Sequence, residues 1–159
     1  MTKKRLNWKF EFRHLLLAAA IVTFIVIVLG VLTRVTAGGS CPDWPTCYGS
    51  WAAPAQSNAI VDYVHRAATV FAGVLGLIAL IWSWRQFRQS RLIFIPLLLS
   101  AFAFGAEIIV SAAGVLYLLP AALESSLHLG LALLIFGLQL LAVSAAFQLK
   151  TPDHLHFRS

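Results

Sequence analysis

The chain has 159 residues, of which 60% are hydrophobic and 11% are charged, and its mean hydropathy is +0.84. A soluble domain of this length could not bury so much apolar surface, so lipid must solvate most of the chain. The formal net charge of +6 does not indicate a nucleic-acid-binding protein, because the basic residues lie beside apolar segments, where they orient a protein in a membrane.

The first apolar segment predicts a helix over residues 15–33. Basic residues precede it, as in a signal peptide. Its apolar stretch is longer than the hydrophobic region of a signal peptide, however, and no clean small-x-small cleavage site follows. We therefore expect a retained membrane-spanning helix, followed by a loop over residues 34–59 that contains both cysteines, Cys41 and Cys47.

Three further apolar segments predict membrane-spanning helices over residues 60–84, 92–118 and 122–148. Each contains ionisable residues, which are rare and costly inside a bilayer. The second carries Asp62, His65 and Arg66 near its start, and the third carries Glu107. The fourth carries His128. The sequence thus predicts an all-α fold, a bundle of four transmembrane helices forming a single domain over residues 1–159.

The distribution of basic residues predicts the orientation of this bundle. Positive residues stay on the cytoplasmic side, so both termini and the 85–91 loop are expected inside, with the 34–59 loop and the turn near Pro120 outside. Cysteines this close together outside the cytoplasm are expected to form a disulfide. That bond would staple the loop or serve as a reversible dithiol near the site. The inner basic residues are Lys3, Lys4, Arg5, Lys9, Arg13, Arg85, Arg88, Arg91, Lys150 and Arg158.

The two intramembrane histidines are expected to lie at the same depth. His65 and His128 each lie about two turns into a helix that runs from outside to inside, at about 1.5 Å per residue. Each could simply bond a neighbouring backbone carbonyl. Their matched depth favours instead a shared ligand near the outer face of the membrane.

The residues around the histidines favour heme over a bare metal ion. Zinc would need further ligands, for which Asp62 and Glu124 are the nearest candidates. The surroundings are small and apolar, however, which suits a flat macrocycle held by two axial histidines. Arg34 and Arg66 lie at the outer edge, where they could meet propionates or reach lipid headgroups. The apolar neighbours are Val64, Ala67, Ala68, Leu127, Leu129, Gly130 and Leu131.

Three segments resemble the heme A synthase family. Residues 30–47, GVLTRVTAGGSCPDWPTC, resemble its first helix and outer loop, with the CPDWP stretch the most specific part. Residues 64–66, VHR, resemble its second-helix heme motif. Residues 127–133, LHLGLAL, resemble its fourth-helix histidine motif. Together these segments span nearly the whole apolar part of the chain.

The resemblance implies an enzyme that oxidises the C8 methyl of heme O to the formyl of heme A, which terminal oxidases use. Such enzymes have two similar four-helix halves, one for the substrate heme and one for a b-type heme. This chain resembles the N-terminal half, with His65 and His128 as axial ligands. The implied partners are heme O, the lipid bilayer, a second copy of the chain in a homodimer, and heme O synthase or a terminal oxidase. The implied location is the cell membrane.

Two residues depart from the family pattern. The family has a catalytic Glu three residues before its second-helix histidine, where this chain has Asp62. The family usually has an amide where Glu107 stands, so Glu107 is a candidate proton relay or a partner to the heme edge. Asp62 keeps the carboxylate but shortens its reach, and is the candidate acid–base group.

Two other classes of function remain open. One is a non-catalytic heme carrier or an electron-transfer cytochrome of b type, which the Asp62 departure supports. The other is a quinone-linked thiol oxidoreductase, which also uses four helices and outer cysteines. That class generally needs a second cysteine pair, and the chain has only Cys41 and Cys47.

Overall fold

The protein is seen here in a computed structural model that describes residues 8–35 and 41–148. Four long helices form: α1 (Trp8–Val35), α2 (Ile60–Phe87), α3 (Arg91–Val115) and α4 (Ala121–Gln148), with a single 3-10 turn, η1 (Ser57–Ala59), before α2. All four are long and apolar enough to cross a membrane, and no strand forms within the described ranges. The predicted all-α class and four spanning helices are confirmed, and the chain is a multi-pass membrane protein.

Three helix ends differ from the predicted positions by three residues or more, and one of them is the end of α2, at Phe87 rather than near 84. The first helix begins at Trp8 rather than near residue 15, because hydropathy marks only the apolar part of a helix that continues beyond it. The third helix ends at Val115 rather than near 118. Tyr117 has a φ of 57°, a left-handed conformation that stops the helix before Pro120.

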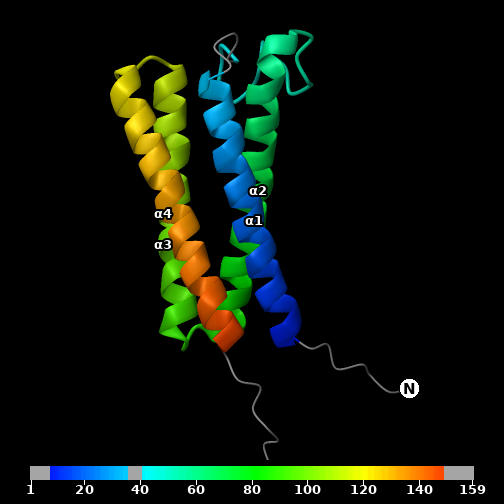
Figure 1. Ribbon diagram of the computed structural model, residues 1–159, viewed down its shortest axis with the longest axis vertical. Helices are drawn as coiled ribbons and strands as arrows, with labels where there is room; N and C mark the ends of the chain where they lie inside the picture. Colours follow the sequence, from blue (N-terminus) through cyan, green and yellow to red (C-terminus); the bar gives the residue numbers. More distant parts are fainter. Residues whose placement is uncertain (1–7, 36–40, 149–159) are drawn as a thin grey trace, which may run out of the picture.

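The helices pack as two antiparallel pairs that lie side by side (Figure 1). α1 packs against α2, and α3 packs against α4; α1 also contacts α4, and α2 contacts α3. α2 and α4 therefore occupy diagonal positions and run in the same direction. Both begin at the end of the bundle that carries the 41–56 loop and the α3–α4 turn, which we call the loop end.

The apolar core lies at the opposite end of the bundle. Its buried members are Phe12, Leu16, Ala79, Ile93, Leu97, Ala142 and Ala146. Phe12 stacks on Phe87 with ring centroids 4.6 Å apart, which joins the start of α1 to the end of α2. Toward the loop end the buried residues include two carboxyl groups, those of Glu107 and Glu124. Packing in this core sets how the helices align along their lengths, and this alignment places the polar residues of the other end.

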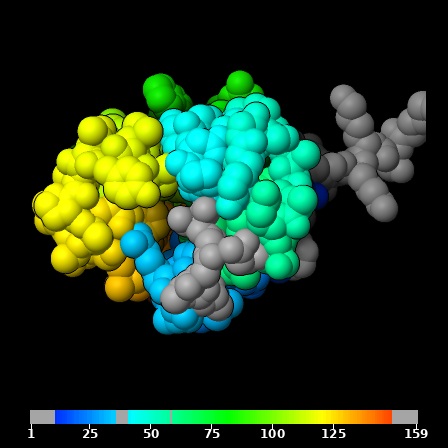
Figure 2. Space-filling model, turned by 90° about the horizontal axis from the view of Figure 1, so that it is seen from above, coloured from blue at the N-terminus to red at the C-terminus, as the bar shows by residue number. Residues whose placement is uncertain are grey.

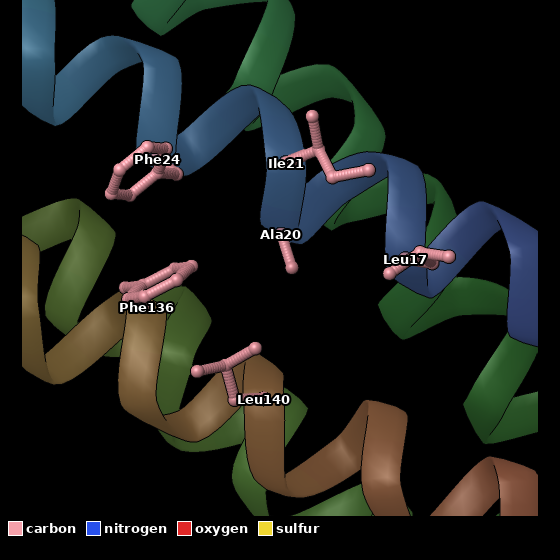
Figure 3. A pocket seen from close by; sticks show the side chains of 6 residues that line it. All are labelled: Leu17, Ala20, Ile21, Phe24, Phe136 and Leu140. Atoms are coloured by element: carbon pink, nitrogen blue, oxygen red, sulfur yellow. The ribbon is translucent and has the colours of Figure 1, made fainter.

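A shallow groove of about 180 Å³ runs between α1 and α4 (Figure 3). Only apolar side chains line it, and Phe24 faces Phe136 across it with ring centroids 5.8 Å apart. A groove without a polar group carries no specific chemistry and suits contact with lipid chains. Its lining residues are Leu17, Ala20, Ile21, Phe24, Phe136 and Leu140.

Candidate functional site

His65 is oriented by the backbone of α1. It lies about 7 Å below the start of α2 at the usual helical rise. Its Nδ1 lies 3.1 Å from the carbonyl oxygen of Val26. The ring also rests against Gly30, where an added Cβ would lie only 3.0 Å from Cε1. A Nδ1 that donates to a carbonyl leaves Nε2 as the nitrogen able to bind a metal.

His128 is oriented by α3. Its Nδ1 lies 3.0 Å from Oε1 of Glu107, although the ring N–H does not point at that oxygen in this conformation. Glu107 is buried, with a side chain 9% exposed, and its Oε2 has no hydrogen-bond partner within the described ranges. Each helix pair therefore supplies one histidine and the group beside its Nδ1.

The two imidazoles lie close together between α2 and α4. Their ring centroids are 6.3 Å apart and their planes are inclined at 62°. A nitrogen lies about 2 Å from a metal that it binds, so two rings on opposite sides of one ion have centroids about 6 Å apart. The separation therefore fits one iron between two axial histidines, and the donor set of two imidazoles in apolar surroundings fits heme.

The proposed zinc alternative finds less support. A site of two histidines and two carboxylates would bring His65 and His128 together with Asp62 and Glu124. No group of three or more potential metal ligands is assembled anywhere in residues 8–35 or 41–148. The two carboxylates point to other partners, as described next.

Glu124 joins α4 to α1 at the loop end. Both of its carboxylate oxygens lie 2.6 Å from Nη2 of Arg34, and Arg34 Nη1 donates to the hydroxyl of Ser125 at 2.9 Å. Glu124 is buried, whereas the Arg34 side chain is 48% exposed. An added Cβ on Gly114 would lie 2.5 Å from Glu124 Cγ, so α3 approaches closely here. Arg34 thus lies at the loop end, with its guanidinium bonded to Glu124 and Ser125.

The loop over residues 41–56 covers one side of the loop end. In Figure 2 its cyan residues gather on one side, while the yellow α3–α4 turn lies on the other. Cys41 and Cys47 form a disulfide, with Cα atoms 4.7 Å apart. Both are buried against Ala59 and Tyr63, so this small cluster ties the loop to the first turn of α2.

Asp43 organises the turn that the disulfide closes. Its carboxylate accepts hydrogen bonds from the backbone N–H of Tyr48 at 2.7 Å and of Gly49 at 2.9 Å, and from the hydroxyl of Thr46. The bond from Thr46, followed by that from Gly49, holds the pKa of Asp43 below its ordinary value of 3.8. Gly49 has a φ of 71°, which only glycine adopts without strain.

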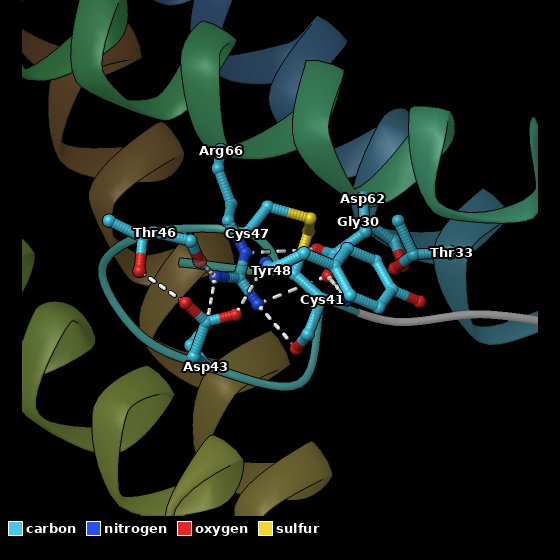
Figure 4. A network of polar contacts seen from close by, with 9 residues as sticks. All are labelled: Gly30, Thr33, Cys41, Asp43, Thr46, Cys47, Tyr48, Asp62 and Arg66. Carbon is cyan, nitrogen blue, oxygen red and sulfur yellow. Dashed lines mark hydrogen bonds and ion pairs between the residues drawn. A yellow bond between two sulfur atoms is a disulfide. The ribbon is translucent and has the colours of Figure 1, made fainter. Parts of the chain in front are cut away.

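Arg66 anchors this loop with every donor that it has (Figure 4). Nη1 donates to the carbonyl oxygens of Asp43 and Thr46 at 2.7 and 2.9 Å. Nη2 donates to Cys41 O at 3.2 Å and to Asp62 at 3.1 Å, and Nε donates to Asp62 at 3.3 Å. A guanidinium has five N–H donors, and all five are used here. In this conformation none is left for a propionate.

Asp62 is part of the same anchor. One of its oxygens accepts the backbone N–H of Cys41 at 2.8 Å, and both meet Arg66. It lies one turn from His65 on α2, as the sequence predicts, yet its charge is paired and its oxygens are turned to the loop. The structure therefore links the predicted catalytic carboxylate to the disulfide loop.

Sequence reasoning missed two groups that orient His65. The carbonyl of Val26 leaves no mark in a sequence, since every residue carries a carbonyl. Gly30 was visible only as part of the 30–47 segment. A glycine inside a predicted helix, opposite a functional side chain, was the one available signal of close approach.

Comparisons with known proteins agree with this architecture. Residues 13–60 match the model of the cytochrome oxidase assembly protein family, COX15-CtaA. The chain is 30% identical over 131 residues to a heme A synthase of Exiguobacterium sibiricum, covering 79% of this chain and 44% of that protein. It is 28% identical over 126 residues to a heme A synthase of Bacillus licheniformis, covering 79% and 41% respectively.

A third relative has a different name. The chain is 28% identical over 148 residues to a protein named protoheme IX farnesyltransferase of Halobacterium salinarum, covering 92% of this chain and 32% of that protein. The chain spans less than half of the length of each of these three relatives. No solved structure matches it. The family model and the several heme A synthases among its relatives support membership of the heme A synthase family.

Proposed function

We propose that the chain is a heme A synthase-like membrane oxidoreductase that converts the C8 methyl of heme O to a formyl group. His65 and His128 would hold the heme as axial ligands through their Nε2 atoms. The observation that carries this proposal is the pair of neighbouring imidazoles, 6.3 Å between centroids, each with its Nδ1 beside a different partner. The names of the relatives support heme as the ligand.

The residues around the site would bind and orient the heme, and they are not themselves the oxidant. Bound heme iron supplies the redox chemistry, whereas the protein positions the reacting methyl and excludes water. Arg34, at the exposed outer edge, is the cation we assign to a propionate. Asp62 is the proposed acid–base carboxylate beside the methyl, which requires that it exchange its contact with Arg66 for one with the substrate.

The setting proposed for the site follows from charge and loop chemistry. The site lies near the loop end, and we place that end at the extracytoplasmic face of the cell membrane, with both termini cytoplasmic, because Arg13, Arg85, Arg88 and Arg91 lie at the other end of the bundle. The disulfide is consistent with that side. We also propose a homodimer with its axis along the membrane normal, because a single four-helix unit would leave one side of a heme at this site facing lipid. Heme O synthase and a terminal oxidase are the proposed functional partners.

A second candidate function has one observation in its favour. The Asp62 carboxylate is occupied by Arg66 and by the backbone of Cys41, so no free carboxylate faces the histidine pair from α2. A protein with this arrangement could hold a b-type heme for electron transfer or delivery without modifying it.

Heme ligation is tested on protein purified from membranes. We expect a low-spin six-coordinate spectrum that His65→Ala or His128→Ala changes. His14→Ala is the matched control, because His14 lies near the other end of α1, beside Phe147. A spectrum that is unchanged in both site variants would refute the proposed ligation.

Catalysis is tested by extracting pigments from a host that supplies heme O. Wild-type protein should produce heme A. Asp62→Asn should bind heme but produce none, because the shape survives and the charge is lost. Asp62→Glu should retain activity. Heme O that stays unmodified in the presence of heme-loaded wild-type protein would establish the second candidate instead.

A further inference from the structure

The two histidines differ in what their Nδ1 atoms meet. His65 meets a neutral backbone carbonyl, that of Val26, at 3.1 Å. His128 meets a carboxylate, that of Glu107, at 3.0 Å. Each contact comes from the helix that is paired with the histidine's own helix, so both are built into the packing of the bundle.

In the described part of the chain, the Glu107 side chain makes no hydrogen bond or ion pair other than its contact with His128. Its Oε2 is buried without a hydrogen-bond partner, and its Oε1 lies beside His128 alone. The neighbouring Glu124 differs, because Arg34 occupies both of its oxygens. Burying a polar group without a hydrogen-bond partner costs free energy, and the imidazole of His128 is the group within reach of Glu107.

Ligation would complete the contact between Glu107 and His128. A histidine that binds iron through Nε2 carries its proton on Nδ1, so the proton that this pair shares lies between Nδ1 and Oε1. The distance of 3.0 Å already suits a hydrogen bond, and a small rotation of either group would align it. A carboxylate partner makes a ligating imidazole more basic than a carbonyl partner does.

We propose that Glu107 is a positioning residue that makes His128 the firmly held axial ligand and leaves His65 as the ligand that exchanges. This inference rests on the proposed heme site and adds to it which of the two histidines would leave the iron. A small molecule that bound the iron would take the place of His65, on the side of α1 and α2, while His128 would hold the heme.

The first experiment compares the two histidine variants. Heme-loaded membranes are solubilised, and transfer of heme to excess apomyoglobin is followed by absorbance. His65→Ala should retain heme on His128, with a five-coordinate spectrum. His128→Ala should lose heme about 10–100-fold faster, the range expected for losing a supported metal ligand. Equal rates, or faster loss from His65→Ala, would overturn the proposal.

The second experiment separates charge from shape. Glu107→Gln keeps an oxygen able to accept from Nδ1 but cannot carry a negative charge. Its heme should have a higher reduction potential, because ferric iron loses more stabilisation than ferrous iron. A tenfold change in that preference corresponds to about 59 mV for one electron. Ser100→Ala is the control: it is buried on the same helix, about 10 Å away along the axis.

The outcomes separate this inference from the proposed function. Wild-type protein without heme would overturn both. A heme-loaded wild type whose potential is unchanged by Glu107→Gln would overturn the role of Glu107 alone. A higher potential in Glu107→Gln and an unchanged one in Ser100→Ala supports it. The comparison of His65→Ala with His128→Ala stands even if Glu107→Gln does not fold.

Discussion

The substitution Gly30→Ala is expected to damage heme binding without unfolding the protein. The added Cβ would lie 3.0 Å from Cε1 of His65, 3.5 Å from Nδ1 and 3.6 Å from Nε2. Ordinary contacts are 3.4–4 Å, so the ring must retreat from α1 by a few tenths of an ångström. That movement lengthens the 3.1 Å contact between Nδ1 and the carbonyl of Val26.

Two effects on the free energy of unfolding oppose each other in this variant. Replacing glycine by alanine inside a helix stabilises it by about 1 kcal/mol. Crowding a packed site costs about 1–3 kcal/mol. The net change in stability is therefore small. Loss of the group that orients a metal-binding histidine typically weakens binding by about 10–100-fold. A near-normal fold with weakened heme binding is the expected signature.

The assay measures heme affinity by titration and unfolding by heating in detergent, both on the same preparations. Gly137→Ala is the matched control, since Gly137 lies on α4 well away from His128 and an added Cβ there meets nothing within 4 Å. It gains helix propensity only and should bind heme normally. Equal heme affinities for Gly30→Ala and Gly137→Ala would refute the role assigned to the α1 backbone.

Three further predictions concern the outer edge of the site. Gly114→Ala should lower the thermal midpoint, because its Cβ would lie 2.5 Å from Glu124 Cγ in the ion pair with Arg34, and overpacking costs about 1–3 kcal/mol. Arg66→Lys should raise the rate of proteolysis in the 41–56 loop about tenfold, because three donors replace five; an unchanged rate would contradict the anchor. Because the pKa of Asp43 is lowered on folding, its contribution to loop stability is present above pH 3.8 and is lost as the pH falls below that value. Hydrogen exchange of residues 43–50 against pH should show this loss in wild type and not in Asp43→Asn.

The four spanning helices could be predicted because the bilayer acts on each one separately. A segment of about 20 apolar residues is enough for a span, whatever it packs against. The direction of α2 and α4, and so the matched depth of His65 and His128, followed from an even number of crossings and the helical rise. These features depend on local composition and connectivity, which a sequence displays.

The partners within the site could not be predicted, because they depend on how the helices register. The pairing of His128 with Glu107, rather than with Glu124 one turn away, is set by the contact between α3 and α4. Arg66 lies at the outer edge as predicted, yet only the folded loop brings three carbonyl oxygens to its guanidinium. The carbonyl of Val26 becomes special only where α1 meets His65. The sequence by itself determined the helices and the depth of the histidines, whereas the tertiary structure decided their partners, since hydrogen bonds depend on distances of a few tenths of an ångström that packing alone sets.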